Sequence, residues 1–221
     1  MGVIQSMSHH TGSASANEVL FGRATACIGW LDAGKMTLHN VTTREATCMS
    51  VIPRPESNEY NDYMGAYISR VPDDGRILEH LESGIEKVKL LVKAMPVHKL
   101  DVPHAPGEWT VKEVLLHMID TERVFAYRAL RIARGDTIAL PGFEQDDWMP
   151  YTHANTRSLD SIFAEYDAVR AASIALLNTF SDEDFLREGF AGGHALTVRA
   201  AAYVLVGHEL HHLASLQENY A

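Results

Sequence analysis

The residues best suited to chemistry lie near the C-terminus, in the run Gly207-His208-Glu209-Leu210-His211-His212. His208 and His212 are four residues apart, so on a helix both imidazoles lie on one face and can bind the same metal ion. Apolar residues share this face, which indicates that it points into the protein. Buried imidazoles still have ring nitrogens to satisfy, and a divalent transition metal would satisfy them. His211 lies ~60° off this face and is an alternative ligand in place of His212.

His117, in a separate predicted helix, is the candidate third ligand. Three protein ligands with one open coordination position are typical of catalytic rather than structural zinc sites. Considered alone, His117 favours the other interpretation, a hydrogen-bonded histidine without a metal, because a single histidine on a helix is usually only hydrogen-bonded. Glu113 and Asp120 lie on the same helix face, where either carboxylate could orient the His117 ring. A purely solvated role is the alternative for both carboxylates.

The same stretch matches the His-Glu-x-x-His motif of zincin metallopeptidases, in which the glutamate, here Glu209, is the general base. The continuation of that pattern is missing. Ser215 and Glu218 stand where metzincins have glycine and histidine. A metallopeptidase is therefore only the third functional hypothesis for this chain.

Arg128 lies on the His117 face, ~16 Å further along the helix, which is too far to contact a shared ion. We expect its guanidinium to form a salt bridge with Glu165 or Asp167 on the next helix. The alternative is that Arg128 binds the far end of an anionic substrate.

The composition excludes several classes of function. The chain has 221 residues with 19 basic and 29 acidic side chains, a formal net charge of −10 and a pI near 5.6. This balance argues against a nucleic-acid surface. No run approaches the ~18 apolar residues that span a membrane, and Cys27 and Cys48 make neither a disulfide framework nor a CxxC site. We therefore expect a cytoplasmic protein that binds neither nucleic acid nor membrane.

Residues 1–55 show neither helical nor strand periodicity, and two prolines close the segment. We expect a poorly ordered N-terminal extension. A mis-called start, with translation beginning at Met49 or Met64, and an independent small domain are the alternatives. The remaining residues, 56–221, are long enough to bury a single core.

Four helices are predicted in residues 56–221. The first lies between Pro72 and Pro96, with Asp73 or Asp74 as its N-cap. The others cover about 110–134, 158–180 and 197–219. The second begins with a capping box of Thr110 and Glu113, and Thr197 is the N-cap of the fourth. No segment alternates like a strand, so we expect an all-α four-helix bundle.

The heights of the histidines predict how the helices run. His117 lies seven residues into the second helix, ~10 Å from its start, and His212 lies about seven residues from the end of the fourth. An antiparallel pairing of these two helices therefore brings the three histidines level. The long crossover loop, residues 135–157, lets the third helix run parallel to the second, which gives an up-down-down-up order.

Four motifs together resemble the DinB/YfiT-like superfamily of metal-dependent enzymes. They are the runs Gly107–His117, Asp120–Leu130, Leu140–Phe143 and Gly207–His212. The resemblance implies an up-down-down-up bundle, often dimeric, that binds a divalent ion such as Zn²⁺ or Ni²⁺ through three histidines. By position these are His117, His208 and His212.

The resemblance implies two chemistries, hydrolysis and S-transfer with a low-molecular-weight thiol. Both use a metal with an open position to lower the pKa of a bound water or thiol. We therefore expect a metal-dependent hydrolase or thiol S-transferase that acts on a small molecule, with Glu209 and Asp120 as candidate catalytic groups. The alternative is a non-catalytic, stress-related bundle that binds a metal or forms homodimers.

Overall fold

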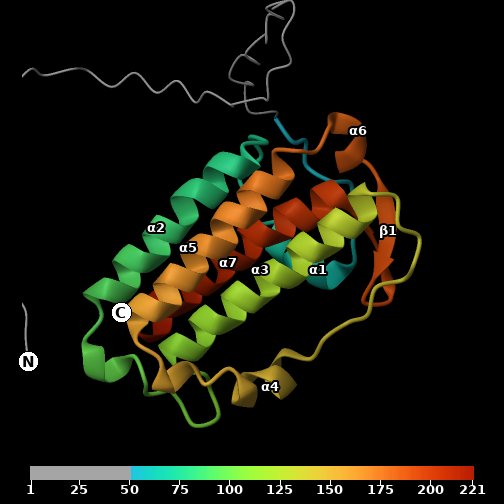
Figure 1. Cartoon of the computed structure of the whole chain (residues 1–221). Helices are drawn as coiled ribbons and strands as arrows, with labels where there is room; N and C mark the ends of the chain where they lie inside the picture. The colour runs from blue at the N-terminus through green and yellow to red at the C-terminus, as the bar shows by residue number, and fades with distance from the viewer. Residues whose placement is uncertain (1–50) are drawn as a thin grey trace, which may run out of the picture. The chain divides into compact units, whose positions relative to one another are not determined.

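Four long helices form the body of residues 51–221, the part of the chain described by this computed structural model (Figure 1). Their bounds are α2 Ile77–Ala94, α3 Val111–Ala133, α5 Leu159–Leu177 and α7 Val198–Asn219. Helix α3 packs most extensively against α7 and α5, and α2 packs against the same two helices. The described part is therefore mostly helical, as predicted.

Shorter elements flank these helices. They are the helices α1 Asp62–Ile68, α4 Gln145–Trp148 and α6 Asp182–Phe185, and the 3₁₀ turns Val97–Lys99, Met149–Tyr151 and Ala154–Thr156. The sequence did not predict α1, which packs against α7. The two helices approach closely at Gly207, which has no side chain. A Cβ atom there would overlap the main-chain carbonyl of Tyr67. In this described part, no helix combines the length and apolar character needed to cross a membrane.

Side-chain caps fix three of the four helix starts where the sequence places them, at Thr110, Ser158 and Thr197. Thr110 and Glu113 form both hydrogen bonds of the predicted capping box at the start of α3. The Thr197 hydroxyl accepts from the main chain at the start of α7, as predicted. The prediction for α2 was wrong, because Asp74 accepts from the main-chain N–H of Arg76 and the helix begins only at Ile77.

A β-hairpin corrects the all-α prediction. Strands β1 Glu188–Ala191 and β2 His194–Thr197 pair antiparallel, with Ala191 opposite His194. Gly192 and Gly193 form the two-residue turn with φ of 61° and 85°, the conformation that tight hairpin turns require and that glycine adopts without strain. The strands are too short for an alternating pattern to be visible. The pair Gly192-Gly193 indicates a hairpin turn, and the all-α prediction did not take it into account.

The boundary at residue 55 was also placed too late. Ile52 is 1% exposed, and its carbonyl accepts a hydrogen bond of 2.8 Å from the hydroxyl of Tyr203 on α7. Arg54 donates to the carbonyl of Ile68 at the end of α1. These residues belong to the packed domain, which a start at Met64 would truncate. The rest of the predicted extension, with both cysteines and Met49, lies outside the described residues.

The buried apolar residues form two clusters, one toward each end of the bundle. On each long helix, polar residues or glycine separate the positions that belong to the two clusters. These are Gly84 on α2, Thr121 and Glu122 on α3, Arg170 on α5, and His208 and Glu209 on α7, and His117 lies one turn before Thr121. A polar layer therefore crosses the middle of the bundle, and the candidate chemistry lies within it.

Gly84→Ala is expected to destabilise the protein, although the sequence alone suggests a gain of ~1 kcal/mol from better helix propensity. A Cβ atom at position 84 would overlap the Oε1 atom of Glu209, and a buried carboxylate has little room to move. The free energy of unfolding, measured in urea, checks this against Ser83→Ala at the neighbouring exposed position. A stabilised Gly84→Ala variant would show that the carboxylate does not occupy this space.

Candidate metal centre

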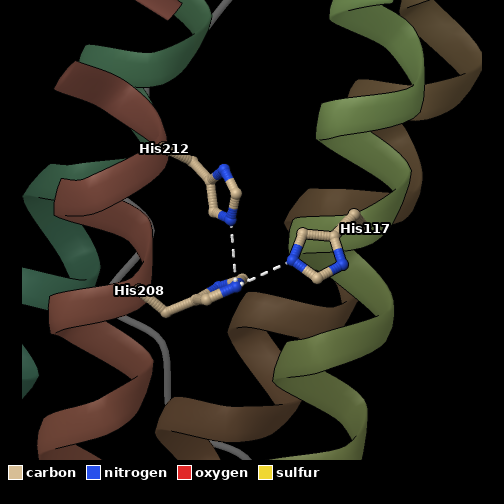
Figure 2. A group of neighbouring side chains, drawn as sticks. All are labelled: His117, His208 and His212. Carbon is tan, nitrogen blue, oxygen red and sulfur yellow. Dashed lines mark hydrogen bonds between the residues drawn. The ribbon is translucent and has the colours of Figure 1, made fainter. Parts of the chain in front are cut away.

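Three imidazoles from two helices meet in the polar layer (Figure 2). The Nε2 atom of His208 lies 2.9 Å from Nε2 of His117 and 3.1 Å from Nε2 of His212. One nitrogen from each ring can be chosen so that all three lie within 4.8 Å of one another. The meeting of these rings at one height, predicted from the spacing along the two helices, is confirmed.

Burial keeps these rings neutral. His117 is 4% exposed and His208 6% exposed. Loss of hydration lowers the pKa of His117 to about 4 and holds those of His208 and His212 well below the usual histidine range. The neighbouring imidazoles lower all three pKa values further, since a second positive charge in this space would be repelled. Neutral imidazole is the form that binds a metal.

This donor set fits a divalent transition metal. Two nitrogens that each lie ~2.1 Å from a tetrahedral ion are ~3.4 Å apart, close to the separations of 2.9 and 3.1 Å between the Nε2 atoms. Three imidazoles with converging nitrogens, two of them buried and that of His212 half-buried, and no carboxylate among them match the ligand preferences of Zn²⁺ or Ni²⁺ rather than Ca²⁺ or Mg²⁺.

Acidification is expected to destabilise the metal-free protein. The pKa of His117 falls from 6.5 to about 4 on folding, so its contribution to stability is complete above pH 6.5 and is lost as the pH falls toward 4. This loss amounts to ~3 kcal/mol for His117 alone. Urea unfolding in the presence of a chelator at pH 7, 6, 5 and 4 measures it, with His117→Gln as the control. If the free energy of unfolding depends on pH equally in wild type and His117→Gln, the lowered pKa of His117 is contradicted.

The groups that contact the imidazoles are not those the sequence suggested. Thr121, one turn after His117, places its hydroxyl 3.5 Å from Nδ1 of that ring. The aromatic rings of Trp109 and Tyr67 pack against His117 and His208, with centroid separations of 4.9 and 5.2 Å. Thr121 could have been found from its four-residue spacing, whereas Tyr67 comes from the unpredicted helix α1.

Both carboxylates predicted to orient His117 have other partners. Glu113 closes the capping box and accepts a hydrogen bond of 3.1 Å from Asn155. Asp120 pairs with Arg123 at 3.2 Å, and burial raises its pKa. Neither forms a hydrogen bond with the His117 ring among the contacts of residues 51–221, so the predicted orienting contact was wrong.

Glu209 points toward helices α2 and α5 and not toward a site for substrate. Its Oε2 atom accepts hydrogen bonds from the Tyr166 hydroxyl at 2.5 Å and from Arg170 at 2.6 Å. The guanidinium of Arg170 also binds Glu122, at 2.9 Å. The carboxylate predicted as a general base is thus held in a buried ion network behind His208, which removes the geometric basis of the metallopeptidase hypothesis.

The alternative ligand His211 is not part of the converging group in the described residues. Its ring packs edge-to-face on Tyr67, with 5.4 Å between the centroids. His212, the ligand favoured by the spacing, therefore lies in the converging group.

The family model of the DinB superfamily matches residues 80–216, which include all three histidines. This chain belongs to the DinB superfamily. The family resemblance of the four sequence motifs is therefore confirmed.

Several curated proteins resemble this DinB-superfamily chain in sequence. "Putative metal-dependent hydrolase YfiT" of Bacillus subtilis is 27% identical over 144 residues, covering 64% of this chain and 80% of the relative. A second protein designated "putative metal-dependent hydrolase", from Bacillus licheniformis, is 22% identical over 160 residues, covering 70% of this chain and 91% of the relative.

Two solved structures share the fold. YfiT from Bacillus subtilis, described as having an unusual four-helix bundle topology, superposes with a TM-score of 0.60 and 23% identity, covering 74% of this chain and 89% of YfiT. The mycothiol-dependent maleylpyruvate isomerase superposes with a TM-score of 0.54 and 12% identity, covering 67% of this chain and 62% of the isomerase. At these low sequence identities, both superpositions show a shared fold and no more.

A cavity opens beside His208 of this DinB-superfamily chain. It has a volume of about 380 Å³, and its walls include His208, Thr121, Tyr67 and Arg128. The salt bridges predicted for Arg128 are absent from the described residues, since Glu165 pairs with Arg123 and Arg157 and Asp167 pairs with Lys89. The cavity is large enough for a small organic molecule.

Proposed function

We propose that this protein binds one divalent transition metal, Zn²⁺ or Ni²⁺, through His117, His208 and His212, and that it acts on a small molecule as a metal-dependent hydrolase or thiol S-transferase. The convergence of three neutral imidazoles, two of them buried and one half-buried, beside a cavity supports the proposal most directly. The designation of its Bacillus relatives as metal-dependent hydrolases agrees with it.

The side chains around the site have separate tasks in this proposal. A bound ion with an open position would lower the pKa of a water or thiol, giving a nucleophile near neutral pH. Thr121 limits the rotation of the His117 ring, Trp109 packs against that ring, and Tyr67 packs against the ring of His208. Asp120 lies beside His117 at a small gap under Trp148. Because burial raises its pKa, we propose it as a proton acceptor for the incoming nucleophile.

Assays of ester hydrolysis and of thiol transfer test the proposal. Zn²⁺-loaded and Ni²⁺-loaded protein is tested on 4-nitrophenyl esters, and on electrophiles with and without a low-molecular-weight thiol. We expect activity that falls at least ~100-fold in His208→Ala, because one of three ligands is lost, and that is unchanged in His98→Ala, where an exposed histidine is replaced. Equal activity in wild type and His208→Ala would contradict the proposal. Bound metal without turnover would favour the non-catalytic bundle.

The order of the helices, the oligomeric state and the cellular location are finer features of the same proposal. His117 near the start of α3 and His212 near the end of α7 meet at one level, which supports antiparallel pairing and hence the up-down-down-up order. The homodimer and the cytoplasmic location stay predictions from the sequence.

A further inference from the structure

Arg128 is a buried cation without a carboxylate partner among residues 51–221. Its side chain is 4% exposed, and its one hydrogen bond there is from Nη2 to the carbonyl of Pro141, at 3.0 Å. Arg170, buried to the same degree, has two carboxylates beside it. A buried charge is normally neutralised by an opposite charge. None of the described residues supplies one to Arg128, so a bound anion would complete its environment.

The guanidinium is also held in place. It lies over the ring of Phe125 at 4.9 Å and near the ring of Phe143 at 5.7 Å. A Cβ atom on Gly192 would be 3.8 Å from Nη2, so the hairpin turn closes a third side. Arg128 lines the cavity beside His208 and also a second one on the other side of Phe143, and among residues 51–221 only its Nη2 atom donates a hydrogen bond, so the other N–H groups of the planar fork are available to a ligand. Such a fork binds a carboxylate through two parallel hydrogen bonds.

The cavity joins this cation to His208, one of the three converging histidines. Arg128 and His208 both line it, and Thr121 and Phe125 line it between them. Arg128 follows His117 by eleven residues, which is close to three turns, so both lie on one face of α3 with their Cα atoms ~16 Å apart. Side chains on a helix lean toward its N-terminus, which brings the guanidinium nearer to the histidines.

We infer that Arg128 binds the carboxylate of a small-molecule substrate whose reacting end lies at the three histidines. The binding of a carboxylate by Arg128 does not depend on the proposed function. The placement of the reacting end at the histidines does rest on it. A single guanidinium matches one negative charge, and the exposed Glu144 and Asp146, which also line the cavity, would repel a dianion. A monocarboxylate therefore fits this subsite better than a phosphate ester.

Calorimetric titration with a matched pair of probes tests the subsite. The probes are 3-phenylpropionate and its neutral amide, and each is titrated into the full chain in metal-free and Zn²⁺-loaded form. We expect wild type to bind the acid at least ~10-fold more tightly than the amide, in both forms. Arg128→Gln should bind the two probes equally. Arg134→Gln, which removes an exposed cation further along the same chain segment, should behave as wild type.

Equal affinity of wild type for the two probes overturns the inference, whatever the variants do. A preference that survives in Arg128→Gln, or that exists only with Zn²⁺ bound, also overturns it, because the carboxylate would then be binding the ion. Should Arg128→Gln fail to fold by circular dichroism, Arg128→Lys keeps the charge, and its preference should weaken without vanishing. A protein that binds no Zn²⁺ but keeps the preference would contradict the proposed metal site and leave the subsite intact.

Discussion

His208→Ala is expected to weaken Zn²⁺ binding by more than ~100-fold, since loss of a direct ligand should cost more than loss of an outer-shell partner. The Nε2 atom of His208 faces those of both other histidines, at 2.9 and 3.1 Å. Its removal leaves only two imidazoles, those of His117 and His212. Competition with a chromophoric chelator at pH 7.5 measures the affinity of each protein.

The same titration includes His98→Ala and His211→Ala as controls. His98 is exposed, and His211 packs on Tyr67 outside the converging group. Both variants should bind Zn²⁺ within ~3-fold of wild type, since neither removes a ligand. If His211→Ala loses the ion and His212→Ala keeps it, the ligand set proposed here is wrong.

Arg170→Met is expected to reduce the free energy of unfolding of the metal-free protein by ~3–5 kcal/mol. Arg170 is 3% exposed and binds Glu122 and Glu209, which are 4% and 3% exposed. It also donates to the carbonyl of Leu81 on α2. Burial opposes its charge, but the adjacent carboxylates raise the pKa of Arg170 above its ordinary value. Methionine would leave two buried carboxylates without a cation, and urea unfolding measures the cost.

A compensated variant separates lost charge pairing from lost packing. In the triple variant Arg170→Met, Glu122→Gln, Glu209→Gln, no unpaired charge is left in the layer, so much of the stability should return. Arg123→Met, at a half-exposed salt bridge on α3, should cost less than ~1 kcal/mol. A change of less than ~1 kcal/mol in Arg170→Met would show that the buried network does not stabilise the fold.

Local signals in the sequence were sufficient for most of the helices. The capping box at Thr110 and the N-cap at Thr197 are short-range contacts, and both are present. The hairpin turn at Gly192 was missed because its strands have four residues each, too few for alternation to be visible. Helix α1 has seven residues and depends on packing against α7, which no local pattern reports.

The candidate site was predictable where it depends on helical spacing. His208 and His212 share a face because they are four residues apart, and His117 was placed by its height along a helix. The partners of Glu209 and Arg128 were not predictable in the same way. They depend on which helix packs opposite, and the sequence offered several carboxylates for each arginine.

X-ray absorption of wild-type protein loaded with one equivalent of Zn²⁺ tests the central claim most directly. The distance and type of each ligand are read from the scattering around the ion, and imidazole rings give a characteristic outer-shell pattern. We predict three imidazole nitrogens at ~2.0–2.1 Å and one further light atom. A first shell with sulfur, or with fewer than three imidazoles, would contradict the claim that His117, His208 and His212 hold one ion.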